Sequence, residues 1–170
     1  MNNQITITHN DTNTEKSLHD TDFYKWALHN ANLIRQGRFT DIDVVNVVEE
    51  LESMGNNNKK ELASRLLVLI MHLLKWQYQP KRRSRSWIST INTQRAEIEF
   101  LLEFSPSLKH DIELIMEKAY KKAKISFENE TDFDKKHLPE LCPYTFEQLI
   151  DYGFRPESFA DNKTLHLENK

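Results

Sequence analysis

Apolar residues recur along most of the chain every three or four positions, and no segment alternates between apolar and polar residues. The first spacing places apolar side chains on one face of an α-helix, whereas alternation is typical of a β-strand. In segment 58–79, for example, leucines and isoleucine form a broad apolar face, and Pro80 follows as a helix terminator. The pattern predicts an all-α protein, a helix bundle of about five to six helices.

Capping residues and helix breakers define the predicted bounds. Thr40 with Asp43 three residues later resembles a capping box, and we expect Gly55 to end the helix that Thr40 starts. Ser105 and Pro106 are typical of the first positions of a helix. The predicted helices cover 22–36, 40–55, 58–79, 84–104 and a stretch from Ser105 through Ala123, followed by a short helix capped by Thr145.

The two ends of the chain lack this periodicity. Residues 1–19 are rich in Asn and Thr and have little apolar content, and residues 156–170 are similar. We expect a disordered arm and a disordered tail at these positions. The chain of 170 residues is long enough for one domain with its own core. The sequence therefore predicts a single helical-bundle domain over residues 20–155.

The composition excludes several classes of protein. Only 3 of 170 residues are glycine, which argues against a glycine-rich phosphate loop or a dinucleotide-binding fingerprint, and we predict no cofactor. The single cysteine, Cys142, excludes an internal disulfide and a cysteine-cluster zinc site. The longest apolar run, 66–71, is far shorter than the roughly 20 residues of a membrane-spanning helix, and no apolar signal core is present. We expect a cytoplasmic protein that does not enter a membrane.

Charge is sorted along the chain. Between Leu62 and Arg95 there are seven basic residues and no Asp or Glu, whereas residues 1–61 contain ten acidic and six basic residues and residues 96–170 contain 16 and 10. The net charge of −3 therefore includes a strongly positive middle. Such a segment favours contact with an anion, which could be a nucleic acid, a small phosphate compound or the acidic remainder of the chain.

Most of this positive charge falls in residues 75–87, which we call the basic turn because they join two predicted helices. Cations at the start of a helix oppose its dipole, so their concentration there indicates an anion site. Guanidinium and hydroxyl groups both donate hydrogen bonds to phosphate oxygens. The candidate residues for binding an anion or a nucleic acid are Lys75, Lys81, Arg82, Arg83, Arg85, Ser84 and Ser86. Alternatively, these cations pair with the acidic flanks.

Four further polar residues lie on the apolar sides of predicted helices, namely Glu49, Glu52, His72 and Arg95. We expect a buried network in which Arg95 pairs with Glu49 or Glu52, because an unpaired buried charge is costly. The same residues are the candidates for catalysis, with Arg95 holding a phosphate and the others exchanging protons. A Glu-x-x-Glu pair near a histidine could also bind a metal, but bundle sites of that kind repeat the pair. The next two helices carry no second pair, so we predict no metal.

Several short motifs resemble a known family. The most specific is the run from His72 to Pro80, which is followed by Arg83-Ser84-x-Ser86-Trp87. Further motifs lie at residues 22–26, 33–39, 49–55, 94–95, 105–108 and 142–144. Together they resemble the bacterial domain-of-unknown-function family number twenty-nine over about residues 20–155. The resemblance implies an all-helical bacterial protein and implies no reaction, ligand or catalytic residue.

Three functions of different classes are consistent with these residues. The first is a non-catalytic binding module that grips the phosphate groups of RNA or DNA through the basic turn. The second is an enzyme acting on a phosphate ester, a nuclease or nucleotide hydrolase, through Glu49, Glu52, His72 and Arg95. The third is a protein-binding adaptor, and a homo-oligomer or a protein partner stays open. We favour the binding module, and the sequence leaves open whether the protein is an enzyme.

Overall fold

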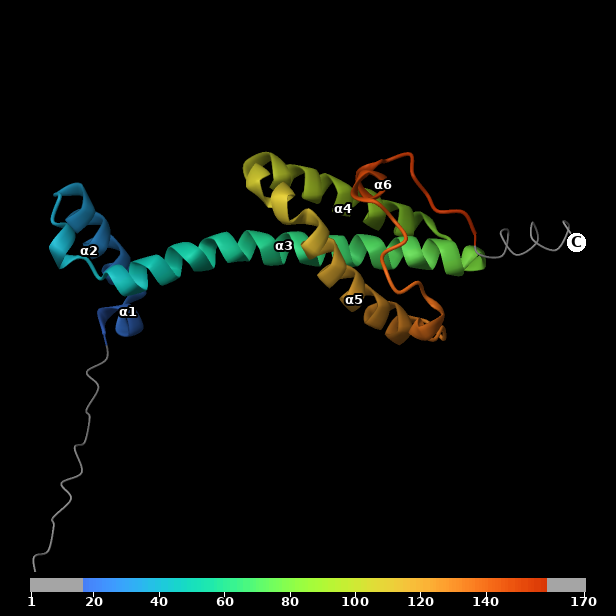
Figure 1. Ribbon diagram of the computed structural model, residues 1–170, viewed down its shortest axis with the longest axis horizontal. Coiled ribbons are helices and arrows are strands. Elements are labelled where there is room, and N and C mark those ends of the chain that lie inside the picture. Colours follow the sequence, from blue (N-terminus) through green and yellow to red (C-terminus); the bar gives the residue numbers. More distant parts are fainter. Residues whose placement is uncertain (1–16, 159–170) are drawn as a thin grey trace, which may run out of the picture. The chain divides into compact units, whose positions relative to one another are not determined.

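The computed structural model describes residues 17–158, which form helices and no β-strand (Figure 1). This confirms the predicted all-α fold. The α-helices are α1 (Leu18–Thr21), α2 (Phe23–Arg35), α3 (Val44–Tyr78), α4 (Arg85–Phe104), α5 (Ile112–Glu130) and α6 (Phe146–Ile150). Short 3-10 helices occupy Phe39–Asp41, Pro80–Arg82, Pro106–Asp111 and Lys135–His137. None of the helices in residues 17–158 has the length and apolarity needed to cross a membrane.

The predicted arm over 1–19 and tail over 156–170 lie outside the described residues except at their inner ends. At those inner ends, α1 begins at Leu18 and the side chain of Ser158 is buried. Where the sequence analysis expected one domain over 20–155, the described residues divide into two compact units. The first unit extends to Ser53, the second begins at Met54, and the division falls within α3.

In the first unit, a buried polar residue fixes the start of α3. Asn30 is 3% exposed, and its side-chain oxygen accepts a hydrogen bond from the backbone N–H of Asp43 at 2.9 Å. The indole of Trp26 donates to the Asp43 carboxylate at 2.9 Å, and that carboxylate also accepts from the first turn of α3. Asp43 therefore caps α3, and the prediction of Thr40 as the cap is wrong. Thr40 lies in the preceding 3-10 helix.

The prediction that a helix ends at Gly55 is also wrong, because α3 continues through this residue. Glycine ends a helix when it adopts a positive φ. Among the described glycines only Gly37, which follows α2, does so, with a φ of 72°. A Cβ atom added to Gly55 would meet no atom within 4 Å, so no close contact requires a glycine there. The predicted helices 40–55 and 58–79 are one helix.

The hydrophobic core of the second unit is formed by residues of α3, α4 and α5, and α6 packs against α4 and α5. In Figure 1, α4 lies along α3 and α5 crosses α3 obliquely. Leucines and isoleucines of α3 spaced three or four apart supply the centre of this core, as the periodicity predicts. The fully buried ones on α3 are Leu62, Leu66, Leu69, Ile70, Leu73 and Leu74. Pro80 follows the end of α3 at Tyr78, and Ser84 caps α4 by accepting from the backbone of Trp87.

Gly55→Ala tests whether α3 is continuous, and Gly37→Ala is the comparison at a glycine with a positive φ. We expect Gly55→Ala to raise the free energy of unfolding by about 0.5–1 kcal/mol, because alanine is the better helix former and has room here. Gly37→Ala should lower it by about 1 kcal/mol, because alanine is strained at a positive φ. Urea denaturation followed by circular dichroism measures both changes. A destabilising Gly55→Ala would instead indicate a helix break at this residue.

Candidate functional site

The basic turn presents a group of cations to solvent. After α3 ends at Tyr78, the 3-10 helix Pro80–Arg82 reverses the chain and α4 begins at Arg85. The exposed members of the predicted anion-binding set are Lys81, Arg82, Arg83, Ser84, Arg85 and Ser86. The turn therefore places four cations and two hydroxyl-bearing residues within six consecutive positions.

The four exposed cations of the turn have no acidic partner in the part of the chain that the structure describes. Within residues 17–158, no carboxylate lies at ion-pair distance from Lys81, Arg82, Arg83 or Arg85, whereas cations elsewhere do pair, as Lys59 does with Asp111. The alternative expectation, that these cations pair with the acidic flanks, is not met by the described residues. Their field is directed at solvent.

Two arginines from distant parts of the chain lie at one tryptophan. The guanidinium carbon of Arg83 lies 4.8 Å from the ring centroid of the half-buried Trp76, and its Nε donates to the Trp76 carbonyl at 2.9 Å. Arg155 lies 6.0 Å from the same centroid and is held by the side-chain oxygen of Asn92 at 3.1 Å. Sequence reasoning missed Arg155, because it lies far along the chain from the turn and no local motif marks it.

Lys75 does not belong to this exposed surface. It is 8% exposed, its ammonium group pairs with Glu130 of α5, and it lies 5.8 Å from the ring centroid of Trp87. The prediction that Lys75 takes part in an exposed anion site is therefore wrong. The physical reason is its place on the helix, which directs the side chain inward, where a buried ammonium group needs a carboxylate.

Arg95 points inward as predicted but does not pair with Glu49 or Glu52. It has no exposed surface, and it donates to the backbone carbonyls of Leu149 at 2.7 Å and Phe154 at 3.1 Å. Burial, and then the charge of Arg155, lower the pKa of the Arg95 guanidinium to about 10. The prediction of a buried Arg–Glu network is wrong, because Nε and Nη2 of Arg95 donate to backbone carbonyls and not to carboxylates, while Nη1 has no partner among the described residues.

The hydrogen-bond partners of Arg95 do not include the other candidate catalytic residues, Glu49, Glu52 and His72. Glu49 and Glu52 are exposed residues of the first unit. His72 is half-buried, and its Nδ1 lies 2.8 Å from the carbonyl oxygen of Val68 in the preceding turn of α3. No three His, Cys, Asp or Glu side chains within residues 17–158 are grouped so that they could hold a metal ion. None of the contacts made by these residues forms an acid–base pair beside Arg95.

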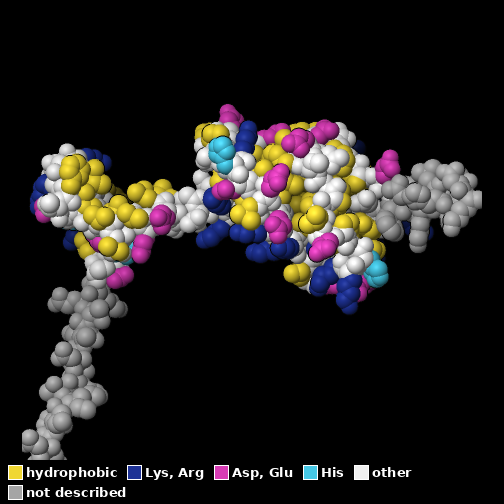
Figure 2. Space-filling model, viewed as in Figure 1, with side chains coloured by type: hydrophobic (Ala, Val, Ile, Leu, Met, Phe, Trp, Pro, Cys, Tyr) yellow, Lys and Arg dark blue, Asp and Glu magenta, His cyan; other side chains and the backbone are white. Residues whose placement is uncertain are grey.

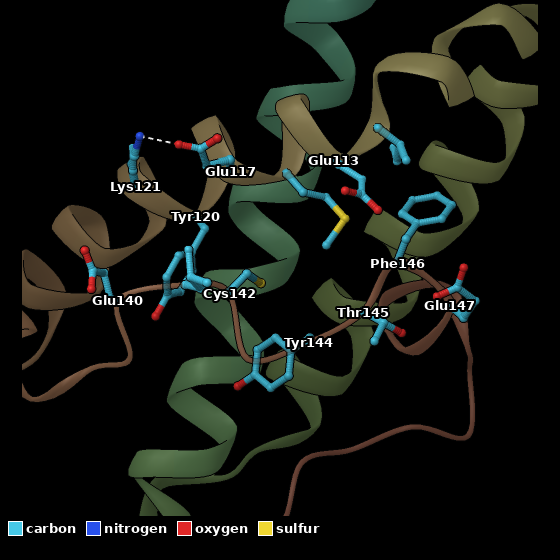
Figure 3. Close-up of a pocket in the computed structure, with 13 residues that line it drawn as sticks. Glu113, Glu117, Tyr120, Lys121, Glu140, Cys142, Tyr144, Thr145, Phe146 and Glu147 are labelled. Atoms are coloured by element: carbon cyan, nitrogen blue, oxygen red, sulfur yellow. Dashed lines mark hydrogen bonds and ion pairs between the residues drawn. The ribbon is translucent and has the colours of Figure 1, made fainter.

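A pocket of about 560 Å³ lies in the second unit between α5 and the segment 140–147 (Figure 3). Its lining includes the hydroxyl-bearing Tyr120 and Tyr144 and the only thiol, Cys142. The Tyr120 hydroxyl donates to the Pro139 carbonyl at 2.7 Å, and the Tyr144 hydroxyl donates to Gln77 at 2.8 Å. Burial raises the pKa of the Cys142 thiol, which keeps it in its less nucleophilic form. The sequence analysis did not predict this pocket.

The comparison with known proteins gives one result that covers most of the chain. A family model described as "Domain of unknown function DUF29" matches residues 18–155. No curated protein and no solved structure matches the chain.

Arg95→Leu should strongly destabilise the second unit. The substitution leaves the carbonyls of Leu149 and Phe154 without their donor, at about 1–3 kcal/mol for each stranded acceptor. Urea denaturation measures the loss, and Arg85→Leu, at an exposed position, should cost under about 0.5 kcal/mol. Combining Arg95→Leu with Glu52→Gln should give additive changes, and a coupling of 1 kcal/mol or more, on the order expected for a direct contact, would contradict this assignment.

His72 should make stability fall at acid pH. Burial lowers the pKa of His72 and the nearby Lys75 charge adds to this, while the hydrogen bond with the Val68 carbonyl and the charge of Glu130 oppose the shift. The unfolded chain therefore binds a proton near the ordinary pKa of about 6.5 that the folded chain resists, so stability is lost as pH falls below that value. His72→Gln should flatten the decline in unfolding free energy between about pH 7 and about pH 5.5. The same substitution at the exposed His110 is the control, and an equal effect there would remove His72 as the cause.

Proposed function

Since the chain belongs to the family described as the domain of unknown function DUF29, whose description names no activity, we propose its function from the geometry of the chain itself. The proposal is a non-catalytic binding module that grips the phosphate groups of a nucleic acid through the basic turn. The residues that bind are Lys81, Arg82, Arg83, Ser84, Arg85 and Ser86 of the turn, together with Arg155.

The observation that carries the proposal is that, within residues 17–158, no carboxylate pairs with the turn's exposed cations. Lys75, the buried cation next to the turn, is held by a carboxylate, that of Glu130. Cations gathered without such partners repel one another, and an external polyanion removes that repulsion by displacing counterions. Phosphate oxygens accept from guanidinium forks and hydroxyls alike, and both donors are present in the turn.

The contacts of Trp76 with Arg83 and Arg155 favour a single-stranded nucleic acid as the partner. Aromatic rings and guanidinium planes are the surfaces on which unpaired bases stack, and they do so with little preference for sequence. Arg83 and Arg155 both lie at the Trp76 ring, so stacking surface and positive charge coincide. Contacts of this kind to backbone and base faces give weak, salt-dependent and sequence-tolerant binding.

The enzyme hypothesis has no comparable support. Arg95 is engaged with two backbone carbonyls, and His72 lies at hydrogen-bond distance from a third. Arg95 has no exposed surface, so its guanidinium does not present itself to a phosphate ester. We therefore advance no second function.

Binding to a fluorescent single-stranded oligonucleotide, followed by anisotropy, tests the proposal. We expect affinity to fall with salt, with a logarithmic slope near −0.7 per phosphate contacted, so that ~3 contacts give about −2. Changing Lys81, Arg82, Arg83 and Arg85 together to Gln should abolish binding and lower the melting temperature only slightly, because exposed cations add little to stability and, within residues 17–158, only Arg83 has a side-chain contact, with Trp76. Arg155→Gln alone should weaken binding and reduce the slope.

A matched control removes the same charge from the same unit. Lys60, Lys109, Lys118 and Lys122 are exposed and have no ion pair within the described residues. Changing these four lysines to Gln should leave most of the binding intact. If the lysine variant loses binding while the basic-turn variant keeps it, or if no binding is detected at low salt, the proposal is wrong.

A further inference from the structure

The first unit exposes far more apolar surface than it buries. Of its large apolar side chains only Trp26 and Leu33 are buried, at 5% and 3% exposure. The exposed ones are Leu18, Phe23, Tyr24, Leu28, Ile34, Phe39, Val44, Val45, Val48 and Leu51. Figure 2 shows hydrophobic side chains gathered over this part of the chain. A folded unit below about 40 residues rarely stabilises itself with so small a core, so its outer surface is suited to binding a partner.

The most regular part of this surface is a stripe on α3. Val44, Val48 and Leu51 follow one another at spacings of four and three residues and are 56%, 46% and 63% exposed. Val45, at 69% exposure, widens the stripe on one side. Side chains at these spacings form the contact line by which one helix packs along another. The stripe therefore has the geometry of half of a helix–helix interface.

One edge of the stripe is negatively charged. Glu52 and Glu49 lie on either side of Val45 around the helix, both are exposed, and neither forms an ion pair with a described residue. Glu50 lies on the other side of α3, where its carboxylate is 2.9 Å from His19. Residues 17–53 contain seven Asp and Glu against three Lys and Arg, so the surroundings do not neutralise this edge.

We propose that the stripe of Val44, Val45, Val48 and Leu51 binds an amphipathic helix of another protein whose apolar side is flanked by lysine or arginine. The apolar contacts supply affinity, and Glu49 and Glu52 select the charge of the partner and fix its orientation. A second copy of this chain fits less well, because two such acidic edges would repel each other. This surface is separate from the basic turn and does not depend on the nucleic-acid proposal.

The probe is a synthetic helix with leucines at heptad spacing and lysines on its flanks, compared with the same peptide carrying glutamates in place of the lysines. The full chain should bind the lysine peptide at least about tenfold more tightly, as measured by fluorescence anisotropy. Glu49→Lys with Glu52→Lys should reverse this preference. Val45→Ser with Leu51→Ser should weaken binding of the lysine peptide by about tenfold or more.

A matched control removes equally exposed apolar groups from the second unit, where Phe100 and Phe104 are 62% and 71% exposed. Phe100→Ser with Phe104→Ser should leave peptide binding unchanged. The charge-reversed variant keeps the apolar stripe, so it decides the question even if the serine variant unfolds. Equal binding of the two peptides, an unchanged preference after charge reversal, or an equal loss in the Phe100/Phe104 control would overturn the proposal.

Discussion

Arg95 is a charged side chain with no exposed surface, and backbone carbonyls of the second unit accept hydrogen bonds from its Nε and Nη2. Its hydrogen bonds to the Leu149 and Phe154 carbonyls hold the segment after α6 against α4. That segment carries Arg155, which Asn92 of α4 holds near the Trp76 ring. A fully buried guanidinium thus helps to fix the position of a second one, which is only partly buried. Loss of Arg95 would therefore disturb the basic surface even though Arg95 itself is not exposed there.

The sequence predicts what depends on local physics. The period of the apolar residues predicts helices in α3 and α5, and the inward direction of Arg95 follows from its position on α4. The partner of Arg95 was not predictable, because a backbone carbonyl is present at every residue and carries no sequence signal. Gly55 was misread for a related reason, since glycine permits a positive φ but does not impose one. The candidate site was predicted where it is one continuous turn, and Arg155 was missed because only the folded chain brings it there.

Two surfaces of opposite character follow from the sorting of charge along the sequence. The exposed cations of the basic turn belong to the second unit, and the acidic edge beside the apolar stripe belongs to the first. In the two proposals, the basic turn binds a polyanion, and the apolar stripe with its acidic edge binds a basic helix. Together the two proposals describe a module that joins a nucleic acid to a protein with a cationic helix, which combines the binding and adaptor hypotheses that the sequence left open.

α3 supplies backbone to two units whose cores differ greatly in size. Its buried leucines between Leu62 and Leu74 belong to the extensive core of the second unit, whereas no residue of α3 before Ser53 is buried. Local opening follows the contacts around each turn, even within one hydrogen-bonded helix. Backbone amides near Leu69 should therefore exchange with solvent deuterium only when the second unit unfolds, while those near Val48 exchange far sooner. Backbone hydrogen bonds within this one helix thus have two very different lifetimes. A partner bound to the first unit would lengthen the lifetime of those near Val48.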